Sequence, residues 1–248
     1  MLNIHQFTYG GDNYGVLLQE PDSGATALVD AGDATAALAA LAETGWSLSQ
    51  IWLTHHHGDH TAGTTEIVAA TGAGVHGPAS IASVTTPVAD GGEIDFGGVK
   101  VTAIATPGHT MDMLNFHIPS EKLLFTGDTL FAMGCGRLFE GDAATMWASL
   151  CKLMSLDDET VIYCGHEYTL SNINFALSID PSNQDLLKLS EWVKHQEKEH
   201  RPTIPTTLEQ QITCNPFLRC DSEYFSTYFD SKNPIEIFGK MRSAKDNF

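Results

Sequence analysis

The stretch Thr54-His55-His56-His57-Gly58-Asp59-His60 places four histidines and one aspartate within seven residues, directly after the apolar run Ile51-Trp52-Leu53. Imidazole and carboxylate groups are the donors that zinc-like ions bind, and a catalytic site also keeps one position for water. Three further donors follow singly, each in a turn marked by glycine: His109 in Pro107-Gly108-His109-Thr110, Asp128 in Thr126-Gly127-Asp128-Thr129, and His166 in Cys164-Gly165-His166-Glu167. The spacing and chemistry of these donors predict a metal site at the end of a short buried strand.

The spacing within the first stretch predicts two metal subsites. His55 and His57 are separated by one residue, so in an extended segment their side chains project to the same side. Gly58 can adopt a positive φ, which would let the chain turn back and present Asp59 and His60 to a second ion. The stretch therefore offers two pairs of ligands.

Asp128 is the donor expected to join the two subsites. Its two carboxylate oxygens can bridge ions that lie about 3.5 to 4 Å apart and share a hydroxide. His56 is expected to point away from the ions, either exposed or in support of a ligand. We expect no ligand among the histidines that lie singly in strand-like or solvated helical contexts, namely His5, His76, His117, His195 and His200.

Length and cysteine content favour a soluble intracellular protein. With 248 residues, the chain can form one large domain or a domain with an appendage, and can bury a core without disulfides. Its five cysteines form no CxxC pair, and the N-terminus lacks a basic region followed by an apolar core. No uncharged apolar run approaches the roughly 18 residues that a membrane span needs. We expect a cytoplasmic monomer that does not contact a membrane.

The net charge of −18 argues against binding to nucleic acid, because phosphate binding depends on clustered lysine and arginine. The charge is uneven: residues 1–165 hold 4 basic and 19 acidic side chains, whereas residues 166–248 hold 9 and 12. A small anionic substrate would therefore be bound from the C-terminal third.

Alternating apolar segments and helical periodicity predict a layered α/β fold. The expected strands are residues 4–9, 16–19, 25–29, 51–53, 99–105, 114–118, 122–125 and 161–164, the first three forming a β-meander. The expected helices are residues 34–43, with Asp33 as N-cap, 64–70, 186–200 and 234–245. In the third helix, Leu186, Leu189, Trp192 and Val193 are expected to share the apolar face.

These motifs resemble the metallo-β-lactamase superfamily, whose signature is HxHxDH. Within it, FAMGCGRLFEG (131–141), YCGHEYT (163–169), CNPFLR (214–219) and RSAKDNF (242–248) resemble the hydroxyacylglutathione hydrolase, or glyoxalase II, family. The resemblance covers essentially the whole chain. It implies a four-layer αββα sandwich over residues 1–166, followed by a helical substrate-binding domain over residues 167–248.

The resemblance also distributes the ligands between two divalent ions, with zinc expected first and iron or manganese left open. One ion would be held by His55, His57 and His109, the other by Asp59, His60 and His166, with Asp128 bridging. Asp30 would support the site from behind the ligands, with an N-cap role before residues 34–37 as the alternative.

The implied reaction is hydrolysis of S-(2-hydroxyacyl)glutathione, above all S-D-lactoylglutathione, to glutathione and D-lactate. It is the second step of the glyoxalase pathway that removes methylglyoxal. A hydroxide bridging the metals, bound near Asp59 and Asp128, would attack the thioester carbonyl. A thiolate leaves readily because the pKa of its conjugate acid is about 8.5, so no serine or cysteine nucleophile is required.

Substrate recognition is expected to use cationic and flat polar groups. By resemblance, Arg242 and Lys245 would bind the glycyl carboxylate, and Arg137 and Tyr168 would line the pocket together with Phe139, which stands where some members have tyrosine. The alternatives are that Arg137 is a turn residue and that Arg242 and Lys245 belong to a frayed basic terminus.

The chain departs from the family pattern after Gly108-His109-Thr110, where Gly-His often follows two positions on but this chain has Asp112 and Met113. The rival enzyme is a glutathione persulfide dioxygenase, an oxidoreductase with one iron held by two histidines and a carboxylate. The helical tail and His166 argue against it. A β-lactamase would leave the C-terminal third unexplained, and a metal-stabilised binding protein without turnover would lack an open coordination position.

Overall fold

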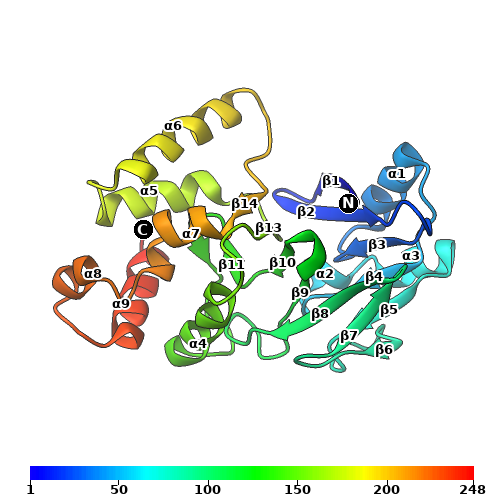
Figure 1. Cartoon of the computed structure of the whole chain (residues 1–248), viewed down its shortest axis with the longest axis horizontal. Coiled ribbons are helices and arrows are strands. Elements are labelled where there is room, and N and C mark those ends of the chain that lie inside the picture. Colours follow the sequence, from blue (N-terminus) through cyan, green and yellow to red (C-terminus); the bar gives the residue numbers. More distant parts are fainter. The chain divides into compact units, whose positions relative to one another are not determined.

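The computed structural model describes residues 1–248, and the chain folds into two compact units (Figure 1). Unit 1 consists of Met1–Ala105 and Asp112–Gly127, and unit 2 of Thr106–Met111 and Asp128–Phe248. The seven predicted ligands are therefore divided between the units. The first histidine stretch belongs to unit 1, whereas the three donors in glycine-marked turns belong to unit 2.

The first sheet of unit 1 has six strands in the order β1-β2-β3-β4-β5-β6. β1, β2 and β3 are antiparallel, which confirms the predicted meander, and β3 to β6 are parallel. The strands are β1 (Asn3–Tyr9), β2 (Asn13–Gln19), β3 (Thr26–Val29), β4 (Gln50–Trp52), β5 (Gly74–Gly77) and β6 (Thr86–Pro87). The ligands predicted on the loop after β4 thus lie at the carboxyl end of a strand in the parallel part of this sheet, a usual place for functional loops.

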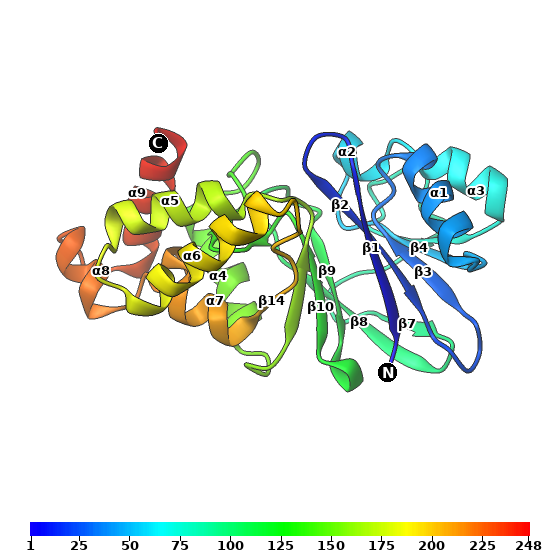
Figure 2. The ribbon, with the colours of Figure 1, turned by 90° about the horizontal axis from the view of Figure 1, so that it is seen from above.

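Helices α1 (Ala34–Thr44) and α3 (Thr64–Thr71) cover one face of this sheet. Figure 2 shows both helices on the same side of the strands. Alanine and leucine side chains of α1 and Ile67 of α3 bury a continuous core against apolar strand residues such as Leu28 and Ile51. Asp33 caps α1 by accepting a hydrogen bond from Ala36 N at 2.9 Å, so the N-cap alternative for Asp30 is wrong.

The second sheet of unit 1 packs against β4 through aromatic side chains. Trp52 is fully buried, and its ring lies 5.2 Å from Phe96, 5.7 Å from Phe116 and 6.4 Å from Phe125. These contacts fix the end of β4, from which the histidine stretch leaves. The elements are β7 (Glu93–Phe96), β8 (Val99–Ala105), β9 (Leu114–Ile118), the 3₁₀ turn η1 (Pro119–Glu121) and β10 (Leu123–Gly127), each strand antiparallel to the next.

Unit 2 is mainly helical. Its strands are β11 (Leu130–Phe131), β12 (Gly134–Cys135), β13 (Val161–Cys164) and β14 (Thr206–Thr207). Its helices are α4 (Ala143–Met154), α5 (Thr169–Ile179), α6 (Gln184–Lys198), α7 (Leu208–Cys214), the 3₁₀ turn η2 (Pro216–Leu218), α8 (Glu223–Tyr228) and α9 (Pro234–Asp246). Helices α5 and α6 lie side by side (Figure 2) and bury Ile173, Leu186 and Val193 in a common core.

One prediction about α6 is wrong. Leu186, Leu189 and Val193 face the core, but the Trp192 side chain is 42% exposed. Positions 189 and 193 lie one turn apart, whereas Trp192 is rotated toward the edge of the apolar stripe and covers it only in part. None of the helices in the chain combines the length and apolar composition needed to cross a bilayer.

Candidate metal centre

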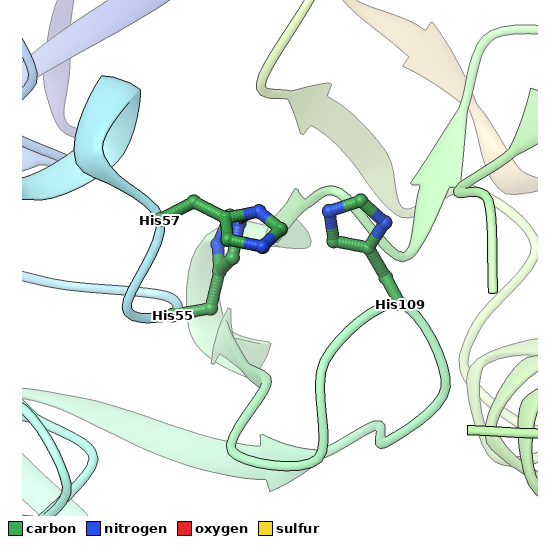
Figure 3. A group of neighbouring side chains, drawn as sticks. All are labelled: His55, His57 and His109. Carbon is green, nitrogen blue, oxygen red and sulfur yellow. Dashed lines mark hydrogen bonds between the residues drawn. The ribbon is translucent and has the colours of Figure 1, made fainter. Parts of the chain in front are cut away.

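The histidine stretch of unit 1 follows β4 as a loop that bends at His56 and groups His55 with His57. Their rings are 4.7 Å apart, and His55 Nε2 lies 3.0 Å from His57 Nδ1 (Figure 3). His56 points elsewhere, with its Nδ1 3.0 Å from Asp112 Oδ1. The predicted grouping of His55 with His57, and the different direction of His56, are confirmed, although the chain bends at His56.

The role predicted for Gly58 is wrong. Gly58 does not adopt a positive φ; it opens the one-turn helix α2 (Gly58–Thr61). The helical turn, rather than a glycine-specific backbone, carries Asp59 and His60 away from the preceding pair. A Cβ at position 58 would have no atom within 4 Å, so the backbone here does not require glycine.

A buried hydrogen-bond network fixes the histidine rings from behind. His60 Nδ1 lies 2.8 Å from Asp30 Oδ2, and Thr54 Oγ1 lies 2.9 Å from the same carboxylate oxygen and 2.9 Å from His55 Nδ1. A carboxylate only accepts, so His60 carries its proton on Nδ1 and the Thr54 hydroxyl donates to Asp30. The hydroxyl oxygen then accepts from His55 Nδ1, which leaves Nε2 of both rings as an acceptor for a cation.

Asp59 is held by groups that the sequence did not single out. Asn13 Nδ2 donates to Asp59 Oδ2 at 3.1 Å, and the Tyr9 hydroxyl donates to the Asp59 carbonyl at 2.9 Å. Both residues flank the turn between β1 and β2, far away in the sequence. The only sequence feature that could have pointed to this contact is the polar side chain of Asn13 at the start of β2.

The donors of unit 2 meet at Asp128. Its Oδ2 lies 3.4 Å from His109 Nε2 and 3.4 Å from His166 Nε2, and all three side chains are buried. His109 Nδ1 lies 2.9 Å from the Arg137 carbonyl, which only accepts, so Nε2 of His109 carries the lone pair that faces Asp128. The Gly127 that precedes Asp128 has a φ of +46°, as expected of a glycine-marked turn.

These donors fit a divalent cation. In each unit, imidazole nitrogens converge on a carboxylate oxygen: His60 on Asp59 in unit 1, and His109 and His166 on Asp128 in unit 2. Two hydrogen-bond acceptors attract each other only through a cation or a proton between them. Nδ1 of His55, His60 and His109 is bonded to a hydroxyl, a carboxylate and a carbonyl, respectively, the arrangement typical of metal-binding histidines.

The residues expected to line the substrate pocket lie on the loops beside these donors. Arg137 lies over the Phe139 ring at 4.8 Å, and the Phe139 ring lies 5.0 Å from His109. The Tyr168 ring stacks on His166 at 4.8 Å with an interplanar angle of 3°. Phe139 and Tyr168 are 54% and 36% exposed, so both have accessible surface beside a predicted ligand.

Arg242 and Lys245 lie on the ordered helix α9, so they are not part of a frayed terminus. Arg242 is 5% exposed; its Nη2 lies 2.8 Å from Asp246 Oδ1 and its Nη1 donates to the Cys135 carbonyl at 3.0 Å. Lys245 Nζ donates to Ser171 Oγ at 3.0 Å, and burial lowers the pKa of its ammonium group.

Burial makes four of the five cysteines unsuitable as nucleophiles. It raises the pKa of Cys135 and Cys214 to about 11 and that of Cys164 to about 12, and it also raises the pKa of Cys220. The reactive thiolate is therefore scarce at neutral pH.

We expect iodoacetamide at pH 7.5 to leave turnover unchanged. Mass spectrometry of the treated protein should find alkylation chiefly at Cys151, the one cysteine that is not buried. Loss of activity in step with modification of a single buried cysteine would contradict this expectation and favour a covalent mechanism.

The chain matches two known protein families, one over each part of its length. Residues 9–166 match the metallo-beta-lactamase superfamily, and residues 167–248 match the family described as hydroxyacylglutathione hydrolase C-terminus. A hydroxyacylglutathione hydrolase of Maricaulis maris (strain MCS10) is 46% identical over 253 residues, covering 100% of this chain and 99% of the relative.

Two solved structures share the fold. ETHE1 from Myxococcus xanthus aligns with a TM-score of 0.72 at 24% identity, covering 97% of this chain and 90% of that one. The B3 metallo-beta-lactamase BLEG-1 aligns with a TM-score of 0.67 at 20% identity, covering 87% of this chain and 99% of that one. At these identities the likeness concerns the fold alone.

Proposed function

The chain belongs to the hydroxyacylglutathione hydrolase family of the metallo-β-lactamase superfamily, and on that premise we propose that it hydrolyses S-(2-hydroxyacyl)glutathione, S-D-lactoylglutathione in particular. The products are glutathione and a 2-hydroxy acid, D-lactate for that substrate. This is the second step of the glyoxalase route by which methylglyoxal is detoxified. The full-length match to the Maricaulis relative is the observation that carries the proposal.

The proposed site contains two divalent ions, with zinc as the preferred pair. Support comes from three triads whose ligand atoms lie within 4.8 Å of one another: His55, His57 and His109; His55, His60 and Asp128; and Asp59, His60 and His166. We assign the first triad to one ion and the last to the other, with Asp128 shared. When bound, such ions acidify a shared water and polarise the thioester carbonyl.

The chain's own residues prepare the site for this chemistry. Asp30 fixes the protons of His60 and Thr54 on the side away from the ions, so no ring must change its tautomer when metal binds. Asn13 occupies one oxygen of Asp59 and thereby orients the other. Because these side chains are already oriented, metal binding does not have to supply the free energy needed to order them.

Glutathione binding is assigned to residues of unit 2, within the helical domain 167–248 and the neighbouring loop. Lys245 supplies the charge for the glycyl carboxylate, because Ser171 engages the ammonium group through two acceptors while lysine has three donors. Arg242 assists from the same helix, although much of its guanidinium is committed to Asp246 and Cys135. Arg137, Phe139 and Tyr168 line the pocket.

Replacing Lys245 with glutamine should raise KM for the glutathione thioester about 10- to 100-fold, because a charge-assisted hydrogen bond contributes roughly 1.5 to 3 kcal/mol. The matched control is Lys240→Gln on the same helix, which removes an exposed lysine paired with Glu236 and should leave KM unchanged. Arg242→Gln should instead lower the unfolding midpoint in urea. An unchanged KM in Lys245→Gln would remove this residue from the binding site.

We further propose that the enzyme acts as a cytoplasmic monomer. Its five cysteines are free, which suits a reducing compartment, and every assigned ligand comes from one chain.

The decisive experiment mixes purified protein with S-D-lactoylglutathione, and separately with glutathione persulfide under oxygen. Thioester loss at 240 nm without oxygen consumption supports the proposal. Oxygen consumption with the persulfide, with the thioester left intact, would assign the chain to the dioxygenase class instead. If the metal-loaded protein gave neither signal, the chain would be a metal-stabilised binding protein without turnover.

A further inference from the structure

His56 stands between two assigned ligands but points away from them, toward a carboxylate. Its Nδ1 lies 3.0 Å from Asp112 Oδ1, and the other oxygen of Asp112 accepts a hydrogen bond from Ser80 Oγ at 2.6 Å. The His56 side chain is 41% exposed and that of Asp112 15%. The resulting Ser80–Asp112–His56 chain lies within unit 1 and belongs neither to the core nor to the assigned ligand sets.

The carboxylate fixes the direction of both hydrogen bonds. Because a carboxylate only accepts, the Ser80 hydroxyl donates to Oδ2 and His56 donates its Nδ1 proton to Oδ1. Asp112 is therefore held at both oxygens, so its side chain has one orientation in which both bonds are made. A bond from so constrained a carboxylate restrains the ring that it binds.

This restraint acts in the middle of the histidine stretch, between two other anchors. At one end, Leu114 N donates to the Thr54 carbonyl at 2.8 Å; at the other, Thr61 Oγ1 donates to the His57 carbonyl at 2.9 Å. The chain bends at His56, where the His56 ring points toward Asp112 while the rings of His55 and His57 lie together, so holding the His56 ring restrains the bend between its two neighbours. Fixing His56 thus also fixes the directions of His55 and His57.

We propose that Asp112 is a positioning residue for the metal pair His55 and His57, acting through His56 and locked by Ser80. The proposal rests on the metal site proposed above. It gives a reason for Asp112 at a position where the family pattern often has glycine: a side chain at this place replaces backbone flexibility with a fixed anchor. Outer partners of metal ligands typically affect metal affinity by 10- to 100-fold when removed.

The test compares zinc affinity, measured by competition with a fluorescent chelator, in four variants. Asp112→Gly and His56→Ala should each weaken binding of one zinc ion about 10-fold, and the double variant should be no weaker than either single one, because both remove the same restraint. Asp112→Asn should stay close to the wild type, since its amide oxygen accepts from His56 and the Ser80 hydroxyl can turn to accept from the amide nitrogen.

Two controls separate positioning from loss of stability. Asp22→Gly removes the same charge in an exposed turn of unit 1 and should change neither zinc affinity nor the thermal midpoint of the metal-free protein. In Asp112→Gly the cobalt-substituted protein should show an altered visible spectrum, which a merely structural role would not produce. Zinc affinity equal to that of the wild type, or additive losses in the double variant, would overturn the positioning role.

Failure of this proposal can be distinguished from failure of the proposed function. If wild-type protein bound no zinc, or bound it without thioester hydrolysis, the proposed function would fall. If wild-type protein bound zinc and hydrolysed the thioester while Asp112→Gly matched it in both respects, only the role of Asp112 would fall.

Discussion

Asp128→Asn should lower kcat/KM for S-D-lactoylglutathione by about three orders of magnitude and reduce the zinc content of the purified protein at both subsites. The change keeps the size of the side chain but removes the charge toward which His109 Nε2 and His166 Nε2 converge at 3.4 Å. Metal ions contribute several kcal/mol to charge stabilisation in a transition state, and about 4 kcal/mol corresponds to three decades in rate. Elemental analysis and steady-state kinetics measure the two effects.

The matched control is Asp142→Asn in the same unit. Asp142 is the N-cap of α4 and accepts a hydrogen bond from Thr145 N at 2.8 Å. Asparagine caps a helix about as well as aspartate, so this variant loses the same charge without losing the cap. It should keep both zinc ions and full turnover. Wild-type metal content in Asp128→Asn would contradict the shared-ligand assignment, whatever the effect on rate.

Elements whose ends carry their own side-chain signals could be predicted from the sequence. Asp33 and the alanine-rich segment after it predicted α1, and the apolar alternation of residues 99–105 predicted β8 with the bounds that the structure has. Helix α5 escaped prediction because Tyr168 at its N-cap makes no side-chain capping bond. Its first turn is instead stabilised by Glu167, which accepts from Thr169 N at 3.2 Å.

The candidate ligands could be named from the sequence, but the residues that support them could not. Histidine and aspartate at the spacing of the first stretch carry a chemical signal that is independent of tertiary structure. The contacts of Asn13 with Asp59, of Arg137 with His109 and of Asp112 with His56 join residues 28 to 56 positions apart. Such contacts depend on how strands are paired and loops closed, and neither single-residue propensity nor periodicity encodes that information.

No sequence pattern identifies Gly32 as the glycine on which the turn of the predicted ligands depends. A Cβ at position 32 would lie 1.8 Å from the Asp59 carbonyl oxygen and 2.7 Å from the Tyr9 ring. The backbone around it is already committed, since Ala31 N donates to the His60 carbonyl at 2.7 Å. The loop after β3 and helix α2 are therefore packed main chain against main chain, at a distance that only glycine allows.

Gly32→Ala should consequently lower the free energy of unfolding by about 3 kcal/mol, the upper range for overpacking, or else displace α2 and with it Asp59 and His60. Urea denaturation measures the first outcome, and loss of one zinc ion with a fall in kcat/KM reveals the second. Gly58→Ala is the internal comparison: it adds the same methyl group in α2 where no atom lies within 4 Å. Because alanine is favoured over glycine in a helical conformation by roughly 0.5 to 1 kcal/mol, Gly58→Ala should be neutral or slightly stabilising with metal content unchanged. If both variants behaved alike, the close approach of Gly32 to Asp59 would not be what holds the ligand turn in place.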